Sequence, residues 1–394
     1  MKPQKRSYTV PELDVSGMKN YRELDARYYQ PVFSREIQIV RGSGTRVWDA
    51  EGREFLDLVA GIAVCSTGHC HPEVVEAICH QARELIHCSN LYYVPGQAEL
   101  AGEISRITGM GKVFLANSGA EATEAAIKLA RVRTGRKRFV AFIHGFHGRT
   151  TGALAVTHKP AIREPFEPLE PKCTFVEYGD LDGLRKAVDS DTAGVFVEPI
   201  QGEAGVIIPP EGFLEGVRET CDARGALLID DEVQTGMGRT GRWLALQHTT
   251  VQADIVTLAK GIASGFPVGA MVAREGLEFR KAEHGSTFAG GPLACAAARA
   301  TLRVIERVLP GVEAKGERFR RGLAAHSPRV RGLMIGITAG DRCPKVQKRC
   351  MERGVLINCA ADGNIRLVPP LTISEQEIDM AIGVIDDALG AGDL

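Results

Sequence analysis

A lysine and a carboxylate at the ends of two apolar segments are the residues of this chain best placed to do chemistry. Lys260 ends the apolar segment ADIVTLAK (253–260) and is followed at once by a glycine-rich turn. Upstream, the segment ALLID (226–230) runs directly into Asp231. Short apolar segments of this kind predict buried strands, and functional residues of open α/β sheets gather where such strands end.

This pair of residues suits a site for pyridoxal 5′-phosphate (PLP). A lysine amine can form a Schiff base with the aldehyde of PLP, and a carboxylate can keep the pyridinium nitrogen protonated. The pairing is weak evidence by itself, because a lysine at a strand end is most often simply solvated. The loops that follow the other predicted strands therefore decide how Lys260 is interpreted.

One of these loops offers a place for a phosphate. NSGAEATEAAIKLAR (117–131) follows the predicted strand KVFLA (112–116). Ser118 can cap the helix that begins there, and the N–H groups of Gly119 and Ala120 lie at its first turn without intrahelical partners. Such a helix start binds phosphate readily, although an ordinary capped helix explains the same residues.

Three further loops supply groups that a flat ring and a carboxylate would need. In FHGRT (146–150), Phe146 can stack on a ring and Arg149 can hold a carboxylate in a bidentate fork, although a loop arginine is usually a solvated charge. EPIQGEAGV (198–206) carries Glu203 in a glycine-flanked loop. Side chains alternate along a strand, so Val233 lies on the same side as Asp231 and can pack under a ring.

The bulk composition is that of a globular protein without a strong electrostatic bias. The chain has 394 residues, of which 44% are hydrophobic and 25% charged, and its 48 basic and 49 acidic residues leave a net charge of −1. Neither nucleic acid nor a membrane is therefore expected as a partner. No stretch approaches the ~20 apolar residues of a membrane span, and no secretory signal is found, so we expect a cytoplasmic location. Residues 1–17 are expected to form a flexible tail, with Met18 as a possible start.

The ten cysteines are scattered singly, without a CxxC pair. This spacing predicts reduced thiols rather than a disulfide framework. One local group could be considered as a metal site and consists of Cys65, His69, Cys70, His71, Cys79, His80, His87 and Cys88. Its spacings match no common zinc pattern, so helix packing and loop chemistry are the preferred interpretation and no metal is expected.

Apolar and amphipathic stretches alternate along the middle of the chain. The expected strands are 112–116, 138–143, 193–200, 226–233, 254–259 and 268–273, and the expected helices are 120–134, 180–189, 212–224 and 292–308. This alternation predicts βαβ units, and hence an α/β fold with a large, mainly parallel sheet covered by helices on both faces.

Both ends of the chain predict a smaller α+β unit. Its expected elements are a hairpin over 46–58, an apolar stretch over 332–340, and helices over 343–353 and 374–389. A further helix is expected over 71–87, at the start of the large domain. We expect the two ends to pack together. The expected division is an N-terminal part of the small domain (18–70), a large PLP-binding domain (71–292) and a C-terminal part of the small domain (293–394).

Six motifs occur in an order and spacing that resemble one known family. They are NSGAEA (117–122), FHGRT (146–150), EPIQGEAGV (198–206), DEVQTGMGRTG (231–241), LAKGI (258–262) and HGSTFAGGPLA (284–294). Together they resemble the class III PLP-dependent aminotransferases of fold type I, from about residue 20 to the C-terminus. GIAVCSTGHCHPEVVEA (61–77) and SNLYYVPGQAELA (89–101) look most like the acetylornithine aminotransferase branch.

The resemblance implies that PLP is the cofactor and that the loops described above bind its ring. Lys260 would carry PLP as a Schiff base and move a proton during the reaction. Asp231 would pair with the ring nitrogen, and Gln234 would contact the phenolic oxygen. Phe146 and Val233 would lie on the two faces of the ring.

The resemblance also implies a homodimer with shared active sites. Ser118, Gly119 and Ala120 would bind the phosphate of PLP within one subunit. Thr287 would reach the same phosphate from the neighbouring subunit.

The substrates that the resemblance implies are N2-acetylornithine and 2-oxoglutarate, in arginine biosynthesis. Arg149 would hold a substrate carboxylate. Glu203 and Arg366 would form a switch, paired while the acylated diamino acid is bound and opened when glutamate needs Arg366 for its α-carboxylate. One site would then accept both substrates in a ping-pong cycle that yields N-acetylglutamate 5-semialdehyde and glutamate.

Two departures from the family pattern bear on this expectation. The family often has GGNPLA where this chain has GGPLA, from which we expect a local change of the loop. Ile62 stands where ornithine δ-aminotransferases carry a tyrosine that helps bind the free α-amino group. An apolar residue there would leave an ammonium group poorly solvated, whereas an acetylated nitrogen avoids that cost.

N-acetylornithine is therefore favoured over ornithine, although Ile62 does not exclude a GABA aminotransferase. Succinylornithine and carrier-linked lysine are the other donors considered. An aminomutase or a dialkylglycine-type decarboxylase on the same scaffold is the alternative reaction class.

Overall fold

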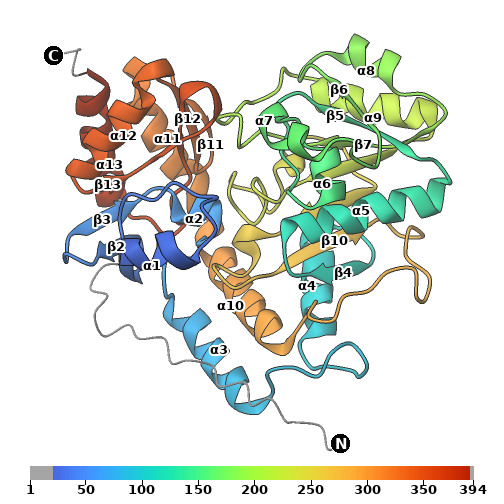
Figure 1. Cartoon of the computed structure of the whole chain (residues 1–394), viewed down its shortest axis with the longest axis horizontal. Coiled ribbons are helices and arrows are strands. Elements are labelled where there is room, and N and C mark those ends of the chain that lie inside the picture. Colours follow the sequence, from blue (N-terminus) through green and yellow to red (C-terminus); the bar gives the residue numbers. More distant parts are fainter. Residues whose placement is uncertain (1–20, 391–394) are drawn as a thin grey trace, which may run out of the picture.

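The computed structural model describes residues 21–390 as two lobes around one shared core (Figure 1). The expected tail at 1–17 and the possible start at Met18 lie outside the described residues. The large lobe contains a seven-stranded sheet, and the small lobe contains two four-stranded sheets built from both ends of the chain. Within residues 21–390, no helix is long and apolar enough to cross a bilayer.

The large sheet has the strand order β4-β10-β9-β8-β7-β5-β6. Its strands are β4 (Val113–Ala116), β5 (Arg138–Phe142), β6 (Cys173–Val176), β7 (Thr192–Val197), β8 (Leu227–Asp231), β9 (Ile255–Leu258) and β10 (Gly269–Ala273). Strands β5 to β9 pair in parallel with their neighbours, and β10 runs antiparallel to both β4 and β9. The predicted large, mainly parallel sheet is confirmed.

Alternating side chains of this sheet enter two separate cores, one on each face. Phe139 and Ala141 of β5 pack into the cluster that contains α5, whereas Val140 and Phe142 pack into the cluster that contains Phe213 of α9. A strand buried on both faces is apolar throughout, which is why these strands appear in the sequence as continuous apolar runs.

Helices and short helical turns connect the strands of the large lobe. They are α3 (Pro72–Glu84), α4 (Gln97–Thr108), α5 (Gly119–Thr134), α6 (Thr151–Ala155), α7 (Pro160–Arg163), α8 (Leu181–Ala187), α9 (Phe213–Arg224) and α10 (Pro292–Val308). In Figure 1, α3 and α10 lie side by side below the junction of the two lobes. Helix α10 carries the chain from the large lobe into the small one.

The small lobe joins the two ends of the chain in one sheet. Its first sheet has the order β1-β2-β3-β13, with β1 (Ile39–Ser43), β2 (Arg46–Asp49), β3 (Glu54–Asp57) and β13 (Val355–Leu356). Its second sheet has the order β11-β12-β15-β14, with β11 (Arg329–Arg331), β12 (Met334–Thr338), β14 (Asn358–Cys359) and β15 (Asn364–Leu367). The helices are α1 (Tyr21–Tyr28), α2 (Ala60–Ala63), α11 (Val312–Gly322), α12 (Cys343–Glu352) and α13 (Glu375–Gly390).

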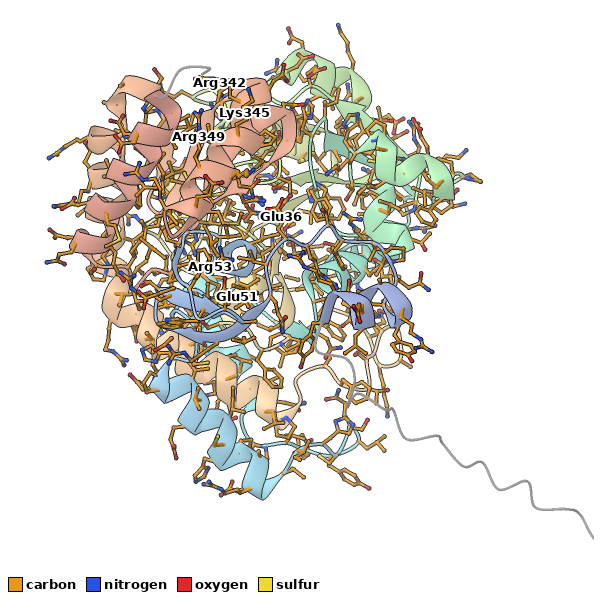
Figure 2. The ribbon with its side chains drawn as sticks, turned by 60° about the vertical axis from the view of Figure 1, so that its left-hand side comes forward. Glu36, Glu51, Arg53, Arg342, Lys345 and Arg349 are labelled. Carbon is orange, nitrogen blue, oxygen red and sulfur yellow. A yellow bond between two sulfur atoms is a disulfide. The ribbon has the colours of Figure 1, made fainter. Side chains whose placement is uncertain are left out.

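The predicted packing of the two ends and the predicted hairpin are both present. Strand β13 pairs in parallel with β3, and β3 pairs antiparallel with β2. Figure 2 labels Glu51 and Arg53 at the turn of this hairpin, where the Arg53 Nε donates to Asp49 at 2.7 Å. The expected boundaries at 70/71 and 292/293 remain predictions.

Three features differ from the sequence predictions. The edge strand β6 was not predicted, because it is only four residues long and none of its residues is fully buried. Helix α4 was not predicted either. Helix α3 ends at Glu84 rather than at residue 87. The predicted strand 193–200 ends at Val197, and its last residues form the loop that carries Glu203.

The prediction that all thiols are reduced is wrong for one pair of cysteines. Cys343 and Cys359 form a disulfide, and the other eight cysteines are free. These two residues are 16 positions apart and belong to no CxxC motif. The fold, which lays the start of α12 against β14, brings them together. The cytoplasmic location expected from the sequence stays a prediction.

Candidate active site

Strand β9 delivers Lys260 to the carboxyl edge of the large sheet. The strand ends at Leu258, and Lys260 begins a short 3-10 turn with a backbone φ of 46°. This left-handed conformation costs roughly 1–3 kcal/mol in a residue other than glycine and is a known mark of functional sites. The turn is held by the small lobe, because the Ser66 hydroxyl donates to the Gly261 carbonyl at 2.8 Å.

The neighbouring strand β8 ends at Asp231, whose carboxylate is 3% exposed and fixed by three donors. The Val233 N–H and the Thr257 hydroxyl donate to Oδ1 at 3.0 and 3.1 Å. The His147 Nδ1 lies 2.6 Å from Oδ2. Three contacts leave lone pairs on the carboxylate, so Asp231 can still accept a proton-bearing ring nitrogen.

Strand β4 leads into the start of α5, where Ser118 is the N-cap residue. The Ser118 side chain accepts from the Glu121 N–H at 3.2 Å. The N–H groups of Gly119 and Ala120 precede the first intrahelical bond, which joins the Ala122 N–H to the Ser118 carbonyl. A side chain at Gly119 would place its Cβ 2.9 Å from Val233, so glycine is needed for this close approach.

These residues line one cavity of about 370 Å³. Its wall contains nine of the residues singled out from the sequence, namely Ser118, Gly119, Ala120, Phe146, Arg149, Asp231, Val233, Gln234 and Lys260. The structure therefore brings together residues from four loops that are up to 142 positions apart in the chain, from Ser118 to Lys260.

Glu203 and Arg366 form an ion pair next to this cavity. Arg366 lies on β15 with a side chain that is 2% exposed, and its Nη1 donates to Glu203 Oε1 at 2.6 Å. The same nitrogen lies 3.1 Å from Gln234 Oε1, which connects the pair to the cavity wall. Burial raises the pKa of the Glu203 carboxyl, but the Arg366 guanidinium outweighs burial and leaves that pKa below its usual value.

Besides Glu203 and Arg366, two further expected site residues, Ile62 and Thr287, do not line the cavity. The Ile62 side chain is 37% exposed, and Val64 lines the cavity in its neighbourhood. Thr287 is exposed in the loop before α10. The geometry of this chain thus gives no direct contact through which Ile62 would select the substrate, and the Thr287 side chain is accessible at the surface.

Two buried residues near the cavity were missed by the sequence analysis. His147 stands between Phe146 and Arg149 in the same motif, and its contact with Asp231 joins residues 84 positions apart. Burial favours the neutral ring, but the Asp231 carboxylate outweighs burial and raises the pKa of His147. No spacing rule could have found this contact.

The second missed residue is Glu198, which follows β7. Its carboxylate accepts from the Phe146 N–H at 2.9 Å and from the Gly202 N–H at 3.2 Å. It thereby ties the Phe146 loop to the loop that carries Glu203. Burial raises the pKa of the Glu198 carboxyl to about 7.

The electrostatic environment of Lys260 favours a reactive amine. Burial lowers the pKa of the Lys260 ammonium, and the nearby Arg366 guanidinium acts in the same direction. The carboxylates of Glu203, Asp231 and Glu198 oppose this effect without reversing it. A neutral amine is the form that attacks an aldehyde, so the site fits a lysine that binds a carbonyl group.

The residues of the cavity fit PLP on the observations above. The start of α5 suits a phosphate, the carboxylate of Asp231 suits a protonated ring nitrogen, and Lys260 suits an aldehyde. Within residues 21–390, no group of three or more potential ligands is arranged to hold a metal ion. His69, one of the residues considered for a metal, instead lies with its Nε2 2.8 Å from the Asp57 carboxylate.

Most of the chain resembles proteins of one family. The sequence profile described as Aminotransferase class-III matches residues 28–389. The acetylornithine aminotransferase of Methanosarcina mazei is 49% identical over 383 residues, which cover 95% of this chain and 97% of that protein. The acetylornithine aminotransferase of Methanopyrus kandleri is 52% identical over 384 residues, which cover 94% of this chain and 99% of that protein.

Solved structures show the same fold. The ornithine aminotransferase of Toxoplasma gondii superposes with a TM-score of 0.91 at 32% identity, covering 95% of this chain and 96% of that one. Another structure of that enzyme has PLP at partial occupancy in its active site. The N-acetylornithine aminotransferase of Stenotrophomonas maltophilia superposes with a TM-score of 0.79 at 35% identity, covering 93% and 97%.

Proposed function

Because this chain belongs to the class-III aminotransferase family, we propose that it transfers the δ-amino group of N2-acetylornithine to 2-oxoglutarate. The products are N-acetylglutamate 5-semialdehyde and glutamate, in a reaction of arginine biosynthesis. The observation that carries the proposal is the convergence of Lys260, Asp231 and the start of α5 on one cavity, in a chain 49–52% identical to relatives named acetylornithine aminotransferase.

PLP, on which class-III aminotransferases depend, supplies an aldehyde that accepts amino groups and a ring that withdraws electrons. The residues of this chain do the remaining work. Lys260 binds the aldehyde carbon and carries the proton that moves during the transfer. Asp231, held by His147, keeps the ring nitrogen protonated, and the start of α5 holds the phosphate. Phe146 and Val233 exclude water from the two faces of the ring.

The ion pair beside the cavity supports a site that takes two substrates in turn. While the acylated diamino acid is bound, Glu203 neutralises Arg366 and the α-carboxylate of that substrate is held by Arg149 at the exposed rim. Glutamate brings a second carboxylate, which can replace Glu203 on the guanidinium. A bidentate arginine–carboxylate contact is strong enough to compete with the existing pair.

Ornithine is the second candidate donor, since the Toxoplasma ornithine aminotransferase superposes with a TM-score of 0.91. Sequence identity argues against it, because that enzyme is 32% identical to this chain whereas the acetylornithine aminotransferases reach 52%. N-acetylornithine is therefore the preferred donor on the strength of the relatives.

We also propose that the active form is a homodimer. Thr287 lies in a loop beside an exposed apolar patch that consists of Leu91, Tyr92, Tyr93 and Phe288, which are 66% exposed or more. The two segments are joined by hydrogen bonds from the Asn90 side chain to the loop carbonyls. A patch of this kind suits a second copy of the chain, which would bring Thr287 to the phosphate of the other subunit. Light scattering tests the dimer, and Thr287→Ala should weaken phosphate binding in it.

The experiment that tests the donor is a set of half-reactions with the purified holoenzyme. N-acetylornithine, ornithine, succinylornithine and GABA are added separately without a keto acid, and the absorbance of the lysine-bound cofactor is followed. We expect N-acetylornithine to bleach the band at least about tenfold faster than the others, which corresponds to ~1.4 kcal/mol.

Faster bleaching by ornithine or GABA would overturn the substrate while leaving the family chemistry intact. Omission of 2-oxoglutarate provides the control against an aminomutase, because an aminomutase turns over repeatedly without that acceptor. Lys260→Ala, assayed in parallel, should show no band of this kind.

A further inference from the structure

The guanidinium of Arg366 is held at both of its terminal nitrogens, and the contact at one of them does not involve Glu203. Its Nη1 faces Glu203, Gln234 and the Gly202 carbonyl. Its Nη2 donates to the Asn358 side-chain oxygen at 2.7 Å. When a substrate carboxylate displaces Glu203, the Asn358 contact can persist and keep the guanidinium in its plane.

The chemistry of Asn358 suits this task because its acceptor is neutral. A carboxylate in the same position would be a second counter-charge and would compete with the substrate for Arg366. An amide oxygen orients the guanidinium without cancelling its charge. Orientation matters here because the Arg366 side chain is 2% exposed and its Nε, which is also buried, has no hydrogen-bond partner among the described residues.

Asn358 lies on a strand that needs an anchor. Strand β14 consists of two residues at the edge of its sheet, where it pairs only with β15. Helix α12 provides the anchor at two points. Its first residue, Cys343, forms the disulfide to Cys359, and the Gln347 side chain donates to the Ile357 carbonyl at 3.0 Å. Figure 2 marks the course of α12 by the labelled Arg342, Lys345 and Arg349.

We propose that Asn358 is a positioning residue for Arg366 and that the Cys343–Cys359 disulfide anchors it. The inference rests on the proposed role of Arg366 in holding the carboxylate of glutamate or 2-oxoglutarate. It predicts that the glutamate half-reaction depends on the redox state of these two cysteines, whereas the acetylornithine half-reaction does not. A dithiol reductant would deliver two electrons and two protons, giving two thiols and a cyclic disulfide of the reductant.

The first test compares Asn358 variants in the two half-reactions. For Asn358→Ala we expect the rate constant for glutamate at low concentration to fall about tenfold, and that for N-acetylornithine to change less than about twofold. Asn358→Asp keeps the hydrogen bond to Arg366 and the shape of the side chain. Asn358→Asp should leave the melting temperature unchanged or higher. It should nevertheless lower the rate constant for glutamate at least as much as Asn358→Ala does. Equal losses in both half-reactions, or none in either, would overturn the proposal.

The second test concerns the disulfide in holoenzyme purified without reductant. After denaturation, eight thiols should react before reduction and ten after it, as one disulfide among ten cysteines requires. Reduction of the native enzyme should lower the rate constant of the glutamate half-reaction several-fold. The double variant Cys343→Ser/Cys359→Ser should show the same loss without any reductant. Ten reactive thiols at the start would refute the anchor.

The decisive comparison combines the two tests. If the disulfide acts through Asn358, reduction should have no further effect on glutamate in Asn358→Ala. An undiminished effect of reduction in that variant would show that the disulfide acts elsewhere and would overturn the link. Arg366→Ala distinguishes this failure from failure of the proposed function. If Arg366→Ala slows only the glutamate half-reaction, the proposed function stands even if Asn358 has no effect.

Discussion

The contact between His147 and Asp231 gives a prediction that can be worked out from the structure. Both side chains are almost completely buried, at 1% and 3% exposure, and their closest atoms are 2.6 Å apart. His147→Leu removes the donor and leaves Asp231 with the Val233 N–H and the Thr257 hydroxyl. His147→Asn replaces the imidazole N–H with an amide N–H at a similar place and removes the charge.

A hydrogen bond to a charged group contributes about 1.5–3 kcal/mol. If Asp231 needs this contact to hold the ring nitrogen, His147→Leu should weaken PLP binding by about 10- to 150-fold. His147→Asn should lose less, since one donor remains. The assay is a fluorescence titration of the apoenzyme with PLP, accompanied by the melting temperature of each apoenzyme.

The pH dependence of stability provides an independent check. Because the pKa of His147 is raised in the folded protein, its contribution to stability is complete below the ordinary value near 6.5 and is lost as the pH rises through the raised pKa. The difference in unfolding free energy between wild type and His147→Leu should therefore be largest at mildly acidic pH. PLP affinity of wild-type strength in His147→Leu, or equal losses in the Leu and Asn variants, would refute the reasoning.

Three other perturbations give distinct outcomes. Arg366→Ala should slow the glutamate half-reaction by about a hundredfold and the acetylornithine half-reaction by much less, because a buried bidentate contact contributes roughly 3 kcal/mol; equal loss in both would contradict the switch. Gly119→Ala should weaken PLP binding about tenfold or more, because the added Cβ would lie 2.9 Å from Val233. Titration of the apoenzyme with PLP measures the affinity. The Asp57 carboxylate raises the pKa of His69 to about 10, so His69→Gln should lower the unfolding free energy by about 1.5–3 kcal/mol below pH 6.5, and the gap should close as the pH rises through 10. If the difference in unfolding free energy between wild type and His69→Gln, measured by urea unfolding, is unchanged at pH 11, the result would count against that ion pair.

The sequence was sufficient to predict the residues that end strands or begin helices. Lys260 and Asp231 follow buried apolar runs, and the rule that functional residues gather at such ends brought them to one cavity. The Ser118 cap was predicted from local spacing alone and is present. These features depend on short stretches of chain, which is why periodicity and turn residues were enough.

Contacts between distant segments could not be predicted in this way. The pairing of His147 with Asp231 and the contact of Asn358 with Arg366 depend on strand order and register. The disulfide depends on how α12 lies against β14, and ten scattered cysteines contain no such information. The expectation for Ile62 came from family resemblance, and its side chain does not line the cavity of this chain.

The central claim is that the δ-amino nitrogen of N2-acetylornithine passes through the Lys260 cavity to 2-oxoglutarate. The most direct measurement is to supply N2-acetylornithine labelled with ¹⁵N at the δ position, together with 2-oxoglutarate, and to follow the label by mass spectrometry. We expect one labelled glutamate for each N-acetylglutamate 5-semialdehyde formed, and no labelled glutamate from Lys260→Ala. Release of the label as ammonia, or unlabelled glutamate alongside consumed donor, would contradict the account.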